Sequence, residues 1–203
     1  MKLELIDYQR EAAVEVTKRL ARARSDWSQF QARSAFALSA MTGSGKTIIA
    51  TTVIEACLYG SSDLGVDPDP RACFLWVTDD PALNRQTRNK MLAASDLLSP
   101  NQLTILNDGF LDDRLKPGAV HFLNIQQLAA KAGFAQGGSN LRQVSGWDVI
   151  GNTVKSGTTD LYLVLDEAHR GMKAAGDRMS IVRRIIAGQG ANPAVPTVWG
   201  ISA

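Results

Sequence analysis

The sequence predicts an α/β domain in which a parallel sheet carries helices on both of its faces. Short apolar runs alternate along the chain with segments of helical period. These runs are apolar throughout, as in strands that are buried on both faces, and no internal repeat or low-complexity tract competes with them. A length of 203 residues with 45% hydrophobic residues fits one large domain with its own core.

The elements justify this prediction in chain order. The expected helices share apolar residues at helical spacing, and they are residues 6–27, 48–59, 81–98 and 178–188. The expected strands are the apolar runs 34–41, 72–78, 102–106, 119–125, 160–169 and 196–203, of which the fifth ends in acids.

Residues 133–157 fit this alternation poorly. The segment is rich in Gly, Ser and Asn, and it contains one weak helix around Trp147 to Val154. We interpret it as an insertion or a mobile loop.

Composition excludes some classes of protein. The 22 Lys and Arg against 20 Asp and Glu give a net charge of only +2, which argues neither for nor against nucleic acid. Cys57 and Cys73 lie in apolar surroundings and are expected to be buried free thiols, as in a cytoplasmic protein. No run of about 18 apolar residues occurs, and the N-terminus reaches acidic residues at once. We therefore expect neither a signal peptide nor a membrane span.

The stretch "AMTGSGKT", Ala40 to Thr47, stands between an expected strand and an expected helix. It nearly matches the phosphate-loop pattern G-x-x-x-x-G-K-S/T, with alanine in place of the first glycine. Gly43 and Gly45 allow the backbone to approach a phosphate. The main chain of Thr42, Gly43, Ser44 and Gly45 would bind the nucleotide. Lys46 would neutralise the β- and γ-phosphates of ATP, and the Thr47 hydroxyl would coordinate magnesium.

Two acids end the apolar run "LYLVLDEAH". Asp166 is the expected magnesium partner, and Glu167 is placed to orient and deprotonate the attacking water. His169 is either a loop or capping histidine or a link between the nucleotide and the rest of the protein. These acids gain their meaning from the loop at Lys46, because adjacent acids after a strand are otherwise common helix starts.

With "AMTGSGKT" and "LDEAHRG" in place, most of the chain resembles the first RecA-like domain of superfamily 2 DEAD/DEAH-box helicases. It is most similar to the helicase/ATPase subunit of Type III restriction enzymes. The resemblance implies a RecA-like P-loop NTPase fold for residues 1–203. Alanine in the first loop position is ordinary in this superfamily, so Ala40 supports the resemblance.

The resemblance also implies roles for other residues. "DYQREA" looks like the Q motif, in which Gln9 would read adenine and Tyr8 or Arg10 would lie against the base; the alternative is an exposed polar helix face. "GISA" looks like the start of motif III, in which Ser202 would couple hydrolysis to strand binding. Candidate nucleic-acid contacts come from looser matches to motifs Ia and Ib, where solvated residues are the alternative; they are Thr78, Arg85, Gln86, Asn124 and Gln126.

The resemblance implies an ATP-binding motor domain of a helicase or translocase, in a restriction or defence enzyme acting on double-stranded DNA, with RNA as the alternative. Further restriction subunits would be its partners. A second RecA-like domain with the arginine finger is expected beyond residue 203, so this chain alone should hydrolyse ATP slowly or not at all. A P-loop kinase or phosphotransferase and a nucleotide-regulated binding module remain the alternatives.

Three of the tryptophans lie in apolar runs and are interpreted as core or interface residues; they are Trp76, Trp147 and Trp199.

Overall fold

The computed structural model describes residues 2, 4–138, 143–167 and 177–202. Its centre is a six-stranded sheet in the order β1-β6-β5-β2-β4-β3, with every pair of neighbours parallel. The strands are β1 (Ser34–Ser39), β2 (Ala72–Thr78), β3 (Leu103–Ile105), β4 (Ala119–Asn124), β5 (Asp160–Asp166) and β6 (Thr197–Ser202). The predicted parallel sheet is thereby confirmed.

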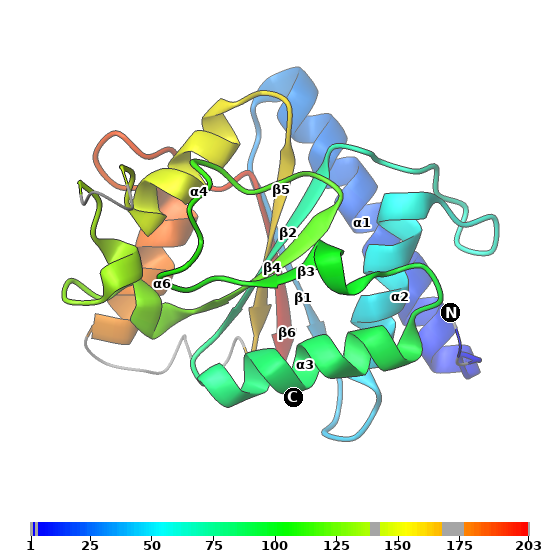
Figure 1. Ribbon diagram of the computed structural model, residues 1–203. Coiled ribbons are helices and arrows are strands. Elements are labelled where there is room, and N and C mark those ends of the chain that lie inside the picture. The colour runs from blue at the N-terminus through cyan, green and yellow to red at the C-terminus, as the bar shows by residue number, and fades with distance from the viewer. Residues whose placement is uncertain (1, 3, 139–142, 168–176, 203) are drawn as a thin grey trace.

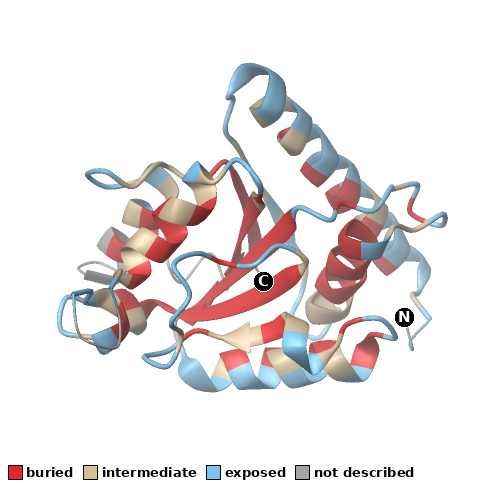
Figure 2. Cartoon of the chain, turned by 45° about the horizontal axis from the view of Figure 1, so that its top comes forward, coloured by how far each residue is buried: buried red, intermediate tan, exposed pale blue. Residues whose placement is uncertain are grey.

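Helices cover the sheet on two sides (Figure 1). One core cluster joins the sheet to α1 (Asp7–Phe30), α2 (Lys46–Tyr59) and α3 (Pro81–Ala94). The other joins it to α4 (Gly146–Lys155) and α6 (Asp177–Ala187). Short 3-10 turns at Pro100–Gln102, Ile125–Leu128 and Gly133–Ala135 complete the connections. In Figure 2 the buried residues gather on the strands and on the inward sides of the helices.

The strands β2 and β4 are buried at every residue, as their continuous apolar runs predict. The strand β1 differs, because it forms an edge of the sheet. Phe36 packs toward α1 and stacks on Trp199, whereas Ala35 and Ala37 face away and are exposed. The expectation that every strand is covered on both faces is wrong for β1, since no described helix packs over this part of its second face.

The segment 133–157 is not a loop throughout. The weak helix expected at Trp147 to Val154 is α4, which extends over Gly146–Lys155 and buries Val149 and Ile150 against the sheet. Ser145 and Asp148 form a reciprocal cap at its start, and the Arg184 guanidinium of α6 lies 4.1 Å from the Trp147 ring centroid. This part of the segment therefore belongs to the core, and the helix expected there is confirmed. The interpretation of the segment as an insertion or a mobile loop otherwise stays a prediction.

Two smaller predictions can be compared with the structure. The helix expected over residues 81–98 ends at Ala94, because the Ser95 hydroxyl accepts hydrogen bonds from the amides of Leu97 and Leu98 and turns the chain. Cys57 and Cys73 are buried free thiols, as expected. Within the described residues, no helix combines the length and apolarity that crossing a membrane requires.

Candidate nucleotide-binding site

The loop between β1 and α2 has the backbone of a phosphate cradle. Gly43 and Gly45 have φ angles of 83° and 82°, which favour glycine. The amide of Ala40 donates to the Ser202 carbonyl of β6 at 3.1 Å, so alanine continues the strand pairing at this position. The first turn of α2 has no side-chain cap among the described residues, and N–H groups at such a helix start can donate to an anion.

The polar side chains of this loop suit a phosphate ligand. The Ser44 hydroxyl is buried and has no hydrogen-bond partner among the described residues, an arrangement that usually has a specific cause. The Lys46 ammonium donates to the carbonyls of Ala40, at 2.7 Å, and Met41, at 3.1 Å. Carbonyl groups of the loop thus accept the hydrogen bonds of the Lys46 ammonium. If a nucleotide binds, phosphate oxygens would replace these carbonyls as its partners.

The start of α1 holds the loop from the other side. Tyr8 Oη and Gln9 Nε2 both donate to the Ser44 carbonyl, at 2.6 and 3.0 Å, while Gln9 Oε1 accepts from the Ile6 amide at 3.4 Å. Gln9 is 8% exposed, so it is not part of an exposed polar face. These contacts place the predicted Q motif beside the phosphate loop and give it a structural role there. Adenine recognition by Tyr8 and Gln9 stays a prediction.

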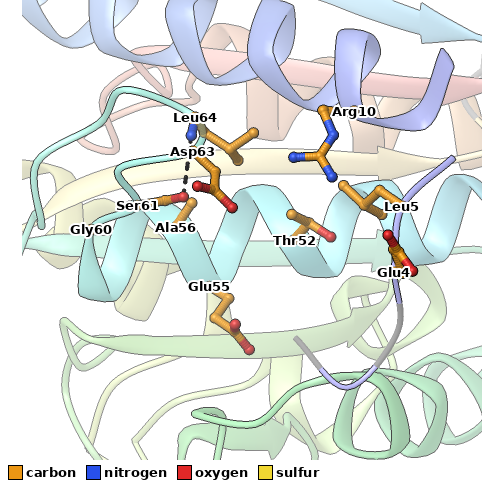
Figure 3. Close-up of a pocket in the computed structure, with 10 residues that line it drawn as sticks. All are labelled: Glu4, Leu5, Arg10, Thr52, Glu55, Ala56, Gly60, Ser61, Asp63 and Leu64. Carbon is orange, nitrogen blue, oxygen red and sulfur yellow. Dashed lines mark hydrogen bonds between the residues drawn. The ribbon is translucent and has the colours of Figure 1, made fainter. Parts of the chain in front are cut away.

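Arg10 lies in a different hollow. It lines a space of about 310 Å³ between α1, α2 and the loop after α2. Figure 3 shows its guanidinium beside Thr52 of α2, whereas the Glu55 carboxylate points away from it. Of the two residues suggested to lie against adenine, only Tyr8 therefore contacts the phosphate loop.

The acidic pair lies at the end of β5, at the same edge of the sheet. Asp166 is the last residue of the strand and is half-buried, and Glu167 has a φ of 54°. A non-glycine residue in this left-handed region costs roughly 1–2 kcal/mol, and such strain is found preferentially at functional sites. The backbone thus leaves the sheet sharply at Glu167, which is where a catalytic acid is predicted.

One pocket of about 630 Å³ brings the two motifs together. Lys46 and Thr47 line it from the phosphate loop, and Glu167 lines it from the end of β5. Thr42, Gly43 and Gly45 also contribute to its wall. The described residues contain no cluster of three or more His, Cys, Asp or Glu side chains that could bind a metal. A magnesium ion would therefore need the Thr47 hydroxyl and phosphate oxygens in addition to Asp166.

Burial changes the acidity of Asp166. It raises the pKa of this carboxyl group, while a hydrogen bond from the Trp76 indole acts in the opposite direction. The indole Nε1 lies 3.3 Å from Asp166 Oδ2. The sequence had suggested only a core or interface role for Trp76.

The helix α3 supplies the part of the pocket that the motifs do not reveal. Lys90, Ala93 and Ala94 line it opposite the start of α2. Lys90 is exposed and forms no salt bridge with any residue that the structure describes. No signal in the sequence distinguishes it from a solvated lysine, because its position depends on how α3 packs beside α2.

The candidate nucleic-acid contacts separate into two groups. Thr78 and Asn124 end their strands but are only 2% and 3% exposed. The Thr78 hydroxyl bonds to Asn84 Oδ1 at 2.8 Å, and Asn124 Oδ1 accepts from the Gln126 amide at 2.9 Å. Their buried positions argue against a direct side-chain contact with nucleic acid. Arg85, Gln86 and Gln126 are exposed, and for them the contact stays a prediction.

The two predicted coupling residues have different outcomes. Ser202 ends β6 in register with Ser39, beside the strand that leads into the phosphate loop. Its carbonyl bonds to Ala40, whereas a coupling role for its hydroxyl stays a prediction. His169 lies outside the described residues.

Similarity to known proteins was found at two levels. A family model described as Type III restriction enzyme, res subunit, matches residues 2–192. None of the curated proteins matches the sequence. One similar solved structure is a nuclease-deletion mutant of the Type ISP restriction-modification enzyme LlaGI in complex with a DNA substrate mimic, with a TM-score of 0.49 and 16% identity. The match covers 99% of this chain and 18% of the LlaGI chain, so this chain spans less than a fifth of that protein.

Proposed function

Because the chain belongs to the family of the Type III restriction enzyme res subunit, we propose that it is the ATP-binding motor domain of a helicase or translocase within a restriction or defence enzyme. One observation carries the proposal. A single pocket is lined by Lys46 and Thr47 of the phosphate loop and by Glu167 from the other half of the chain. This is the juxtaposition that ATP hydrolysis requires, a phosphate cradle facing an acid that can position water.

The loop would bind the triphosphate. N–H groups at the start of α2 and the unpaired Ser44 hydroxyl would donate to phosphate oxygens. Lys46 would leave the carbonyls of Ala40 and Met41 to contact the β- and γ-phosphates. Tyr8 and Gln9 would hold the Ser44 carbonyl through their hydrogen bonds while the phosphate is bound.

The acidic end of β5 would supply the catalytic part. Thr47 and Asp166 would hold Mg²⁺, which when bound neutralises the charge that develops on the phosphate oxygens. Glu167 would accept a proton from the attacking water. The left-handed backbone conformation of Glu167 turns the chain away from the sheet at this residue. This turn would determine the position from which the Glu167 side chain extends.

The energy of hydrolysis would be used on DNA. We propose duplex DNA as the substrate because the family belongs to restriction enzymes, with RNA as the alternative. Arg85, Gln86 and Gln126 would contact the phosphate backbone. A second RecA-like domain would close over the carboxyl edge of the sheet and supply an arginine finger, which is worth roughly 10³ to 10⁵ in rate. Other restriction subunits would be partners, in the cytoplasm.

The test uses the full-length enzyme that contains this chain. Phosphate release from ATP is measured with duplex DNA, with single-stranded RNA and without nucleic acid. We expect duplex DNA to stimulate release, and Glu167→Gln to lower the turnover number by at least about 100-fold while ATP stays bound. Stimulation by RNA alone would replace the DNA assignment.

The same experiment tests the alternatives. Radiolabelled γ-phosphate that appears on an acceptor molecule, rather than as free phosphate, would identify a phosphotransferase. A passive nucleotide-binding module would release no phosphate under any condition, and Glu167→Gln would leave its ATP affinity unchanged. Either result would overturn the motor assignment.

A further inference from the structure

Trp76 is joined to the predicted magnesium ligand by a hydrogen bond across the sheet. It lies on β2 in register with Val164 of the neighbouring β5, two residues before Asp166. The indole Nε1 donates to Asp166 Oδ2 over 3.3 Å. Because an indole N–H can only donate, an ionised carboxylate is its natural partner.

The surroundings of Trp76 hold the indole in place. The side chain is 1% exposed and lies in the core cluster that joins the sheet to α2 and α3. Its ring centroid is 6.3 Å from that of Phe122 on β4. A side chain packed in this way keeps one rotamer, so the N–H is a fixed donor rather than a mobile one.

We propose that Trp76 is a positioning residue for Asp166, holding one carboxylate oxygen so that the other is presented to the nucleotide-bound magnesium ion. The inference rests on the proposed function, because it assumes that Asp166 binds magnesium. Groups that orient a metal ligand from behind typically change metal affinity about 10- to 100-fold when they are removed. Trp76 fits this role because it touches the ligand and is itself buried away from the pocket.

The chain offers a matched control. Trp199 on β6 is also fully buried in the same core cluster, but its Nε1 has no hydrogen-bond partner among the described residues. Trp76→Phe and Trp199→Phe therefore both remove a buried indole and leave an apolar ring. Only Trp76→Phe removes a hydrogen bond to Asp166.

The experiment measures ATP binding to the 203-residue chain by calorimetry, over a series of MgCl₂ concentrations and in EDTA. We expect Trp76→Phe to raise the half-saturating Mg²⁺ concentration about 10-fold or more and to leave binding in EDTA unchanged. Trp199→Phe should keep the wild-type Mg²⁺ dependence. A half-saturating concentration within twofold of wild type in Trp76→Phe would overturn the proposal.

A failure of the proposed function gives a different result. In that case the wild-type chain itself shows no Mg²⁺-dependent ATP binding, whatever stands at position 76. If Trp76→Phe does not fold, ¹⁵N-labelled indole signals of the wild type provide the measurement. The four tryptophans are assigned by replacing Trp27, Trp147 and Trp199 in turn. Adding Mg²⁺ to the ATP complex must shift the Trp76 N–H signal, and an unchanged signal would reject the role.

Discussion

Gly43 and Gly45 have nearly the same φ angle, but different atoms surround them. A Cβ atom on Gly45 would lie 2.4 Å from Gln9 Nε2, whereas at Gly43 it would meet no described atom within 4 Å. Alanine at either position costs roughly 1–2 kcal/mol of left-handed strain. Only Gly45→Ala also displaces Gln9 from the Ser44 carbonyl. We therefore expect Gly45→Ala to lower the free energy of unfolding by about 1 kcal/mol more than Gly43→Ala, measured by urea denaturation.

A double-mutant cycle separates the two causes. In a Gln9→Ala background the side chain that clashes with position 45 is gone, so the difference between the two alanine variants should largely disappear. If the difference persisted in that background, the contact with Gln9 could not be its cause.

A second residue-scale prediction concerns His121 on β4. The side chain is 1% exposed, and burial lowers its pKa from 6.5 to about 4, although the Lys116 backbone hydrogen bond acts in the opposite direction. Because the folded-state pKa is below the unfolded value, this contribution to stability is complete above pH 6.5 and is lost as the pH falls toward 4. The expected loss is about 3 kcal/mol between these limits, measured by urea denaturation across the pH range.

The matched variant is His121→Gln, which removes the titrating group. Nearby Asp112 and Lys116 are present in both proteins, so their titration cancels in the comparison. Wild type should lose more stability than the variant between pH 6.5 and 4. Parallel pH curves would show that His121 does not contribute.

At the scale of the elements, the sequence predicts best what depends on local pattern. The apolar runs of β2, β4 and β5 and the strand-to-helix turn at Gly45 are local features, and the structure contains them. The exposure of Ala37 in β1 could not be predicted, because it depends on β1 being an edge strand. The sequence predicts helix α4 only weakly, because the flanking residues are rich in Gly and Ser and its apolar face is short. The packing of that face against the sheet is evident only in the structure.

The helix α3 gives a prediction at this scale, since its exposed residues have different neighbours. Lys90 lines the pocket that also contains Lys46 and Glu167, near the end of the helix, whereas Arg85 is exposed outside the pocket lining. A lysine without a described carboxylate partner is suited to an anionic ligand. We expect Lys90→Gln to raise the dissociation constant for ATP about 10-fold, corresponding to one charge-assisted hydrogen bond.

The control for α3 is Arg85→Gln, which removes a positive charge from the same helix. Its ATP affinity, measured by calorimetry without nucleic acid, should stay within about twofold of wild type. Equal weakening by both variants would mean that Lys90 acts only through the general charge of the helix.

For the whole molecule, the sheet order decides what the motifs can do. The strand β6 alone separates β1 from β5, so the phosphate loop and the acids meet at one edge. The two motifs predict that Lys46 and Glu167 lie close together, although these residues are far apart in the sequence. The roles suggested for Trp76 and Lys90 could not be found in this way. They depend on β2 lying beside β5 and on α3 lying beside α2, and neither residue belongs to a pattern.

The stability of the whole domain should respond to nucleotide. A ligand that binds only the folded state at 100 times its dissociation constant adds about 2.7 kcal/mol to the free energy of unfolding. For a domain of this size that corresponds to a rise in Tm of roughly 5–10 °C. We expect this rise for the 203-residue chain with ATP and Mg²⁺ in a thermal scan. Lys46→Ala should show no rise at the same concentrations. The ligand-free Tm of that variant is itself expected to fall, because Lys46 bonds to the carbonyls of Ala40 and Met41, so the comparison is between the two shifts. Equal shifts in both proteins would place ATP outside the phosphate loop and would contradict the assignment of the site.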